Sequence, residues 1–399
     1  MSKRFIITLV FLFIVALLGA VAIFLAKGYT FSTDEKRIVG TGIINVTSIP
    51  DAASVYIDGH LTTATDATIG SLPPKTYTVR VVKENFIPWE KQIEVKEGVV
   101  AAVKVTLFPS IPTIYPLTYT GVVNPTLSAD GAKLAYIVPK TNPKGEVNRR
   151  AGVWVWTMVN NQPIAFARSA EPHQVAESDL IDFSSANLKW SPDSKQVIAT
   201  IGNNNYLLNT DTLNPEPRDI TPTLDSTLET WQEDDEEKNV ARIAAIKNTQ
   251  IRKVASESAF LAWAPDETKF MVIKSSDISH QSSDKTKSLK AGTSGTLVSE
   301  ARLKTDSSAK VYDLEKRKEY QLPEAKAHMW LPDSEHVILV DEGTISVADF
   351  DGTNKAVIYA GKFEDSLVFP WPDSSRLVFI TSFPTPTASE PNLYGVNLK

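Results

Sequence analysis

Short apolar runs recur after residue 120, and each follows a turn that contains an aspartate. The runs are rich in β-branched and aromatic residues, as at 197–199 and 270–273, which is typical of buried strands. A further strand-like run follows each of them. Together with the strand before the turn, each unit supplies about four strands, the size of one propeller blade. The turns contain Asp130, Asp193, Asp266, Asp333 and Asp373.

The turns share a sequence with a physical explanation. Proline precedes the aspartate in four of the five units and fixes φ at the first corner of a tight turn. The aspartate side chain can accept a hydrogen bond from the backbone two residues later. Three units have tryptophan three positions before the aspartate, at Trp190, Trp263 and Trp330. We interpret these aspartates and tryptophans as residues that build turns and fill space between sheets, not as catalytic or ligand-binding groups.

These units resemble the TolB-like, WD-related propeller repeats, whose hallmark is Trp-Ser-Pro-Asp-Gly before an apolar strand. Leu127 and Pro370 replace the tryptophan in two units, and only Asp130 is followed by glycine. The resemblance implies a five-bladed β-propeller over residues 110–399, with a sixth, degenerate blade in 210–262 as an alternative. Residues 114–120 are expected to supply a strand that closes the ring with the last unit, since an open edge would otherwise remain.

Residues 40–109 alternate in short strand-like runs and predict a small β-sandwich with Tyr56, Tyr77, Phe86 and Trp89 in its core. Asp58-Gly59 is a hairpin signal. The runs from Pro50 to Gly59, 72–79, 85–89 and 94–98 resemble the PEGA domain, a small surface-associated β domain of bacteria and archaea. This resemblance implies a binding or spacing role and no catalytic residues.

The N-terminal segment has a different pattern. Residues 5–26 contain no charged side chain and follow Lys3 and Arg4. At about 1.5 Å per residue this stretch is long enough to span a bilayer, so it predicts a transmembrane anchor. The positive-inside rule then places the N-terminus in the cytoplasm and the bulk of the chain outside it. Residues 1–39 are expected to form a cytoplasmic tip, the anchor and a linker.

Two segments interrupt the repeats. Residues 226–256 predict a helix, because Ser226 and Glu229 form a capping box, the acidic run 233–237 comes early, and basic residues come late. This helix packs on the propeller or, alternatively, docks a partner. Residues 275–309 are rich in Ser, Thr, Lys and Asp and predict a surface loop.

Composition excludes several kinds of chemistry. A net charge of −6 argues against nucleic-acid binding, and the absence of cysteine excludes disulfides and thiolate sites. There is no Gly-x-Ser-x-Gly motif and no helical His pair, so we expect no catalytic, cofactor or metal residue. The five histidines are expected at the surface or at sheet edges; they are His60, His173, His280, His328 and His336. Trp154, Trp156 and Trp231 could form an aromatic platform for a ligand, but core packing is favoured.

The sequence therefore predicts a membrane-anchored, extracytoplasmic binding or scaffold protein that is not an enzyme. It would engage a protein or a cell-envelope polymer through its propeller, with the PEGA-like domain as spacer or second contact. The alternative is a glycan-active enzyme with acidic residues from several blades in the propeller funnel. A third hypothesis is an assembly scaffold whose helical insert recruits a partner.

Overall fold

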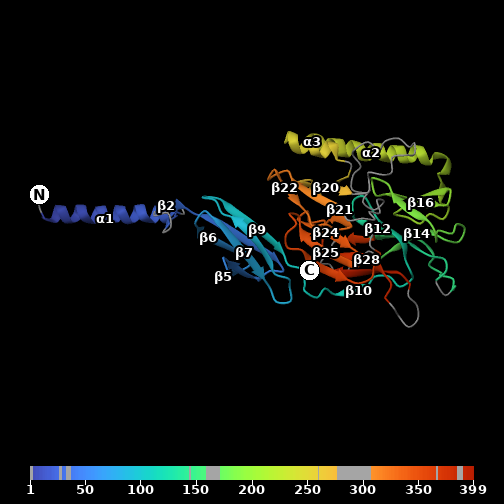
Figure 1. Ribbon diagram of the computed structural model, residues 1–399, viewed down its shortest axis with the longest axis horizontal. Helices are drawn as coiled ribbons and strands as arrows, with labels where there is room; N and C mark the ends of the chain where they lie inside the picture. The colour runs from blue at the N-terminus through green and yellow to red at the C-terminus, as the bar shows by residue number, and fades with distance from the viewer. Residues whose placement is uncertain are drawn as a thin grey trace. The chain divides into compact units, whose positions relative to one another are not determined.

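The computed structural model describes residues 3–26, 29–32, 37–142, 145–158, 171–258, 260–275, 307–364, 367–383 and 390–399. The chain forms two compact units, Met1–Ile111 together with Lys399, and Pro112–Leu398. Figure 1 shows the elements of both units.

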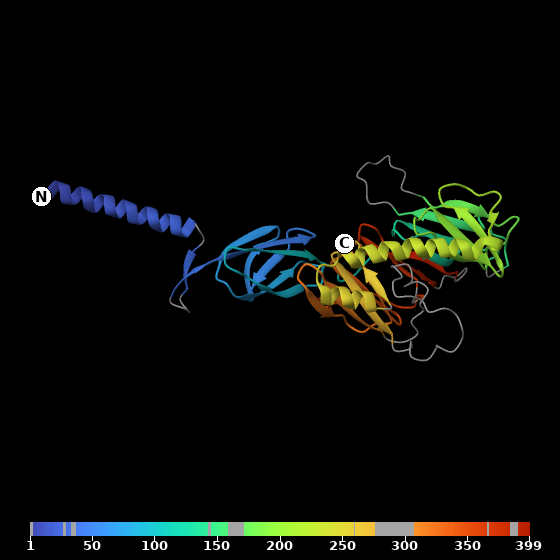
Figure 2. The ribbon, with the colours of Figure 1, turned by 90° about the horizontal axis from the view of Figure 1, so that it is seen from above.

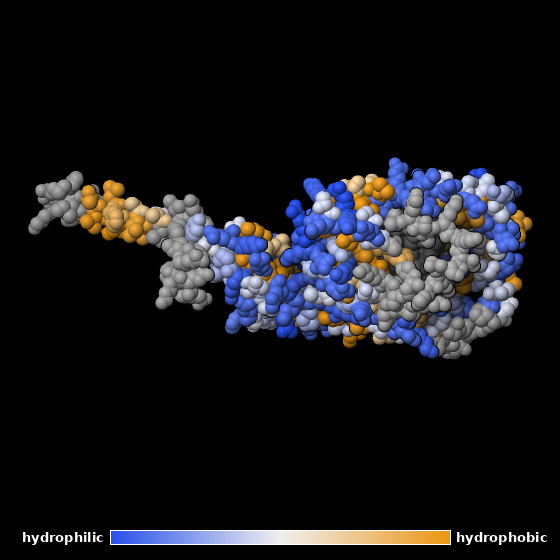
Figure 3. Space-filling model, turned by 45° about the horizontal axis from the view of Figure 1, so that its top comes forward, coloured by the Kyte–Doolittle hydropathy of each residue, from blue (hydrophilic) through white to orange (hydrophobic). Residues whose placement is uncertain are grey.

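The N-terminal segment forms helix α1 (Lys3–Ala26). The prediction of a transmembrane anchor is wrong. Among the residues that the structure describes, no helix is long and apolar enough to cross a membrane. Residues 9–20 of this helix are exposed. Figure 3 shows this stretch as a hydrophobic surface.

The predicted linker also differs from the structure, because it contains a two-stranded antiparallel sheet. Its strands are β1 (Tyr29–Ser32) and β2 (Arg37–Gly40).

A β-sandwich follows, built from one sheet of three strands and one of four. The first sheet contains β6 (Ala67–Leu72), β3 (Gly42–Ile49) and β9 (Val100–Thr106) in that order. The second contains β5 (His60–Ala64), β4 (Ser54–Ile57), β7 (Thr76–Val82) and β8 (Trp89–Glu94). Their inner faces share one core, in which Val46 and Val103 of the first sheet join Val55 and Val79 of the second.

The sandwich agrees with most of its sequence pattern. Asp58 and Gly59 form the predicted hairpin turn, both with positive φ, between the paired residues Ile57 and His60. Tyr77 and Trp89 are buried and Phe86 packs against the core. Tyr56 is not in the core, because it lies between two inward-facing residues of β4 and a strand alternates its faces.

In the part of the second unit that the structure describes, there are five antiparallel sheets of four strands each. The first contains β11 (Val123–Leu127), β12 (Lys133–Val138), β13 (Gly152–Thr157) and β14 (His173–Glu177). The second contains β15 (Asn187–Trp190), β16 (Gln196–Ile201), β17 (Asn204–Asn209) and β18 (Arg218–Asp219). The third contains β19 (Leu261–Trp263), β20 (Lys269–Ser275), β21 (Ser307–Asp313) and β22 (Lys318–Gln321). The fourth contains β23 (Ala327–Trp330), β24 (His336–Asp341), β25 (Thr344–Asp349) and β26 (Ala356–Ala360).

The fifth sheet joins the two ends of this unit. It contains β27 (Val368–Pro370), β28 (Arg376–Thr381) and β29 (Asn392–Asn397), and then β10 (Ile114–Pro116), which pairs with β29. The predicted closing strand is thereby confirmed, over a shorter range than 114–120. The first strand after each inter-sheet connection is the edge strand of its sheet, as in a β-propeller.

Shared cores hold neighbouring sheets face to face. Trp190 of the second sheet lies in one cluster with Val153 of the first, and Trp330 of the fourth with Met271 of the third. Trp371, beside the turn of the fifth sheet, lies in a third cluster with Leu134 of the first. The fourth and fifth sheets meet where Tyr359 packs on Phe379, with ring centroids 4.5 Å apart.

The predicted single helix is two helices preceded by a 3-10 turn, η1 (Thr221–Thr223). They are α2 (Leu224–Ala245) and α3 (Thr249–Glu257). The capping-box prediction is wrong: Thr223 occupies the N-cap position, and the Ser226 hydroxyl donates to the Thr223 carbonyl inside the first turn. Figure 2 shows α2 crossing from the green sheets to the orange ones.

The predicted surface loop, 275–309, lies outside the described residues except at its ends. There, Ser275 pairs with Ser307 as β20 meets β21.

Candidate functional site

The second unit contains a cavity of about 1890 Å³ between its sheets, called the channel below. Residues of four edge strands, β11, β19, β23 and β27, line it, and Arg242 of α2 reaches it as well. In four of the five repeats, the strand that precedes the aspartate turn thus lines the channel, so the repeat itself builds most of the wall.

Part of the channel lining is apolar. It includes Val123, Leu127, Met329 and Phe369. Apolar edge strands also present backbone N–H and C=O groups, since an edge strand is paired on one side only. The wall therefore offers both hydrophobic contact and hydrogen bonding.

Charged side chains gather where the edge strands begin. Lys326 precedes β23, and its Nζ lies 3.3 Å from an oxygen of Glu342 in the turn between β24 and β25. Lys362 and Glu364, between the fourth and fifth sheets, also line the channel. At the other end the aspartate turns form the rim, with Asp130, Pro265, Pro332 and Pro372.

Each turn aspartate accepts a hydrogen bond from the backbone N–H two residues later. The distances are 3.0 Å for Asp130, 3.1 Å for Asp193, 3.0 Å for Asp266, 2.9 Å for Asp333 and 2.9 Å for Asp373. Hydrogen bonding to Ser191 Oγ holds the pKa of Asp193 below its usual value. These carboxylates therefore stabilise the turns through hydrogen bonds to the backbone.

The residue after each aspartate has a left-handed backbone. Gly131, Ser194, Glu267, Ser334 and Ser374 have φ between 57° and 69°. Glycine adopts this conformation without steric cost, whereas the other four residues do not. The backbone is therefore the same in all units even where the hallmark glycine is absent.

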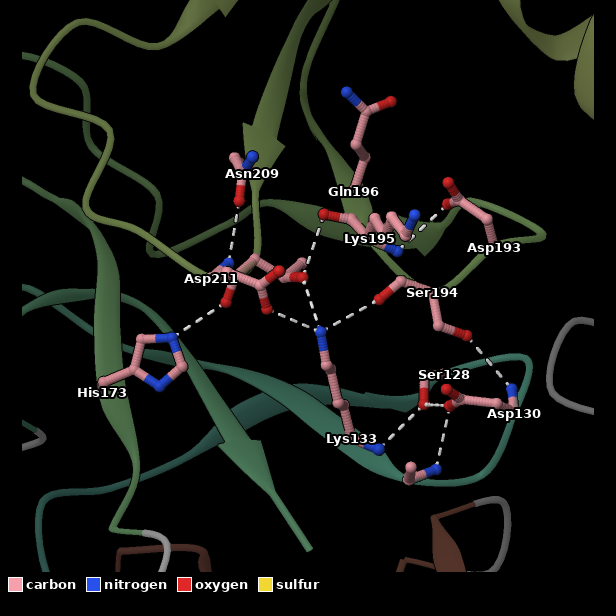
Figure 4. A network of polar contacts seen from close by, with 12 residues as sticks. Ser128, Asp130, Lys133, His173, Asp193, Ser194, Lys195, Gln196, Asn209 and Asp211 are labelled. Atoms are coloured by element: carbon pink, nitrogen blue, oxygen red, sulfur yellow. Dashed lines mark hydrogen bonds and ion pairs between the residues drawn. The ribbon is translucent and has the colours of Figure 1, made fainter.

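A polar network joins the first two turns (Figure 4). The backbone N–H of Asp130 donates to Ser194 Oγ at 3.1 Å. Lys133 reaches from β12 across to the second sheet, where its Nζ lies 2.8 Å from Asp211 Oδ1 and 3.3 Å from the Ser194 carbonyl oxygen. This network fixes one sheet against the next at the channel rim.

The three repeat tryptophans lie between structural elements. Trp190 is buried and its Nε1 donates to the Thr126 carbonyl at 3.0 Å, and Trp330 Nε1 donates to the Ala262 carbonyl at 2.9 Å. Trp263 Nε1 donates instead to Asn239 Oδ1 of α2 at 2.9 Å. Of the proposed aromatic platform, Trp154 is buried and Trp156 packs edge-on against Trp371, so these two rings belong to the core.

Two histidines are buried: His328 lies on the edge strand β23, one of the expected positions, whereas His336 of the inner strand β24 contradicts the expectation. His328 is fully buried and hydrogen-bonded to the Pro323 carbonyl oxygen, and His336 is 5% exposed. His336 Nδ1 lies 2.8 Å from Asp333 Oδ2 and its Nε2 3.6 Å from Asp349 Oδ1. His336 is buried together with two carboxylates, and buried ionisable groups are generally paired in this way. His60 is exposed, His173 is half-buried, and His280 lies outside the described residues.

Sequence analysis missed the charged channel residues. Lys326, Glu342, Lys362 and Glu364 come from loops of different length and share no repeat position. Only their place before or between the predicted strands could have indicated them. Among the described residues, no three His, Asp or Glu side chains gather in a way that could hold a metal ion.

One family model matches the chain, and its match ends at residue 111, where the first compact unit ends. Residues 41–111 match the PEGA domain model, and no curated protein matches the chain. Among solved structures, TolB from Acinetobacter baumannii is 10% identical over 81% of this chain and 60% of its own, with a TM-score of 0.24. Oligogalacturonate lyase from Vibrio parahaemolyticus is 9% identical over 71% and 93%, with a TM-score of 0.29. The β-propeller domain of the Trilobed protease from Pyrococcus furiosus is 12% identical over 70% and 69%, with a TM-score of 0.21.

Proposed function

We propose that this chain is a binding protein that holds an extended segment of a partner, a protein or a cell-envelope polymer, in the channel of its second unit. The observation that carries the proposal is the channel itself. Its volume of about 1890 Å³ exceeds the roughly 300–1,000 Å³ of pockets for small molecules. A polymer segment fills such a space better than a metabolite does.

The lining supports the same proposal. Apolar side chains such as Met329 and Phe369 give hydrophobic contact along the wall, and edge strands can bond to an extended chain. Lys326 and Lys362 with Glu342 and Glu364 give charges of both signs at one mouth. Charges at a mouth steer the approach of a partner and favour one orientation of it.

The alternative of a glycan-active enzyme has less support. Glycoside hydrolysis needs two carboxyl groups placed on either side of one bond. Of the three described carboxyl groups at the channel, Asp130 is engaged in its turn and Glu342 is 87% exposed and paired with Lys326, which leaves Glu364 as the third. We therefore favour binding over catalysis.

The PEGA-like domain adds a second part to the proposal. We propose that it acts as spacer or second contact and that binding takes place outside the cytoplasm. The match of residues 41–111 and the surface association implied by the resemblance support this.

Charge reversal at the channel mouth tests the proposal. The parent chain and a Lys326→Glu/Lys362→Glu variant would be used as bait in chemical crosslinking from cells that express them, followed by mass spectrometry. The variant should lose the main crosslinked partner. A matched control is Lys318→Glu/Lys316→Glu on the turn and outer strand of the third sheet, which should retain it. Equal recovery by both variants and the parent would contradict channel binding.

A further inference from the structure

Each interface between neighbouring sheets is called a seam below. Two seams contain the same pair of hydrogen bonds between sheets, which we call interlocks. In the seam between the first and second sheets, Trp190 Nε1 donates to the Thr126 carbonyl and Asp130 N–H donates to Ser194 Oγ. In the seam between the third and fourth sheets, Trp330 Nε1 donates to the Ala262 carbonyl and Asp266 N–H donates to Ser334 Oγ. Each pair ties an edge strand and a turn to the neighbouring sheet.

At the seam between the second and third sheets, the equivalent groups contact α2 instead. Trp263 Nε1 donates to Asn239 Oδ1 at 2.9 Å, not to a carbonyl of β15. Glu267 occupies the position of Ser194 and Ser334, and its Oε1 lies 2.7 Å from Arg242 Nε. On the other side of the seam, Lys238 Nζ lies 3.5 Å from the Pro192 carbonyl oxygen in the turn of the second sheet. Helix α2 thus takes the place of direct contact between these two sheets.

The face that α2 turns toward this seam is polar. Asn239 is the one buried residue among the 22 of the helix, and its Nδ2 has no hydrogen-bond partner among the described residues. One turn earlier lies Asp235, whose pKa is raised by burial. Apolar burial contributes about 25 cal/mol per Å² to stability. The middle of the helix buries little apolar area, so only a few polar contacts stabilise its packing on the sheets.

The two ends of α2 are held better. Ile243 and Ile246 pack with Phe270 and with Ile251 of α3 against the third sheet. At the other end, η1 leads into α2 and is tied to the second sheet, where the backbone N–H of Asn205 in β17 donates to Thr221 Oγ1 at 2.9 Å. A helix that is fixed at its ends and weakly held between them can open locally without unfolding of the sheets.

Arg242 lies on α2 and also lines the channel, so α2 closes one side of that channel. We infer that α2 is a strap across the seam between the second and third sheets, and that it lifts to open the channel from the side. What enters by this route rests on the proposed function: a polymer segment without a free end would pass sideways where it could not be threaded. The lifting itself does not depend on the identity of the partner.

Hydrogen exchange of the parent chain measures the opening without a ligand. Amides of residues 232–245 should exchange about 100-fold faster than those of β16 and β20, because local opening costs less than global unfolding. Equal protection of α2 and these strands would overturn the inference. The result is independent of partner capture, so its failure is distinguishable from failure of channel binding.

A bridged variant separates lifting of the strap from fraying of the helix. The chain has no cysteine, so Pro192→Cys/Lys238→Cys, at positions where Lys238 Nζ lies 3.5 Å from the Pro192 carbonyl oxygen, can be joined specifically by a short bis-maleimide. The bridge should slow exchange in 232–245 about tenfold or more relative to the unbridged variant, since it blocks separation of the middle of α2 from the second sheet. Unchanged exchange would show that the amides open by fraying and would overturn the strap.

A thiol-labelling pair gives a second measure. Asn239→Cys lies in the strap seam, and Ser334→Cys is its control in the seam between the third and fourth sheets, where Ser334 is 2% exposed. Maleimide should label Asn239→Cys about 100-fold faster under native conditions. Labelling at equal rates would contradict selective opening of this seam.

Discussion

Asp130 and Ser194 belong to turns 64 residues apart, and the backbone N–H of the first donates to the side-chain oxygen of the second at 3.1 Å. Ser194 is 2% exposed and has a φ of 59°. Ser194 stands where the hallmark repeat has glycine. It adopts a strained left-handed backbone conformation, and its hydroxyl accepts a hydrogen bond from the neighbouring sheet. Ser334 does the same for Asp266.

This bond predicts a specific cost for Ser194→Ala. The variant keeps the left-handed backbone strain and leaves the Asp130 N–H without its acceptor, which costs about 1–3 kcal/mol. Ser194→Gly loses the same bond but relieves the strain by about 1 kcal/mol. Urea unfolding should therefore order the stabilities as parent, Gly, Ala. An exposed control, Ser256→Ala, should change little, and equal stability of parent and Ser194→Ala would contradict the interlock.

Trp190 should be a larger contributor than its hydrogen bond alone. Its ring is 3% exposed in the cluster between the first two sheets. Trp190→Ala should cost about 3–5 kcal/mol of unfolding free energy through loss of burial and a cavity. Trp231→Ala, at a half-buried position on α2, is the control and should cost far less. A loss near zero at Trp190 would show that the ring is not a packing residue.

The buried His336 predicts a pH dependence of stability. Burial lowers its pKa, but the hydrogen bond and charge of Asp333 and the charge of Asp349 outweigh burial, so the pKa lies above its ordinary value of 6.5. The resulting stabilisation is complete below about pH 6.5 and is lost as pH rises through the folded-state pKa.

The measurement is the difference in unfolding free energy between the parent and His336→Gln as pH rises. The difference removes the contribution of His328, whose pKa is lowered by burial and which acts in the opposite direction. A difference that shrinks as pH rises from about 5.5 to 8.5 fits the raised pKa. A difference that grows over this range would contradict it.

Features that depend on residues close in sequence could be predicted, whereas contacts between different repeats could not. The aspartate turns marked the edge strands and the strands after them, because Asp–backbone hydrogen bonding is local in sequence. The interlocks at Ser194 and Ser334 could not be predicted, since each joins turns of different repeats. The predicted capping box at Ser226 is absent because the helical backbone begins earlier, at η1, so Ser226 lies inside the first turn of α2.

The candidate site was the least predictable part. Its wall follows from the repeat, but Lys326 and Glu342 come from loops that meet only once the sheets have formed. The place of α2 was also missed. Helical periodicity shows that a helix exists, whereas the bond from Trp263 to Asn239 depends on packing between segments 24 residues apart.

The insert 226–256 and the segment between β20 and β21 should respond differently to deletion. Ile246, Ile251 and Ala255 are core residues of the third sheet, so removal of 226–256 should destabilise the fold. Ser275 and Ser307 are direct strand partners, so Asn-Gly can replace 276–306 as a two-residue hairpin turn. Each halving of a loop lowers its closure cost by about 0.6 kcal/mol, so this replacement should leave the fold intact and raise the unfolding free energy by about 2 kcal/mol. A collapse of the fold on replacement of 276–306 would contradict this view of the third sheet.

Site-specific photocrosslinking tests channel binding most directly. A photoreactive amino acid would be placed at Met329, in the edge strand β23 that lines the channel, and at Val357, in the outer strand β26 of the same sheet. Val357 is 51% exposed, so it is the more accessible of the two positions for nonspecific contact. Irradiation of cells that express each variant should give a discrete crosslinked partner from position 329 and none from 357. Crosslinking from 357 alone would contradict the channel as the binding site.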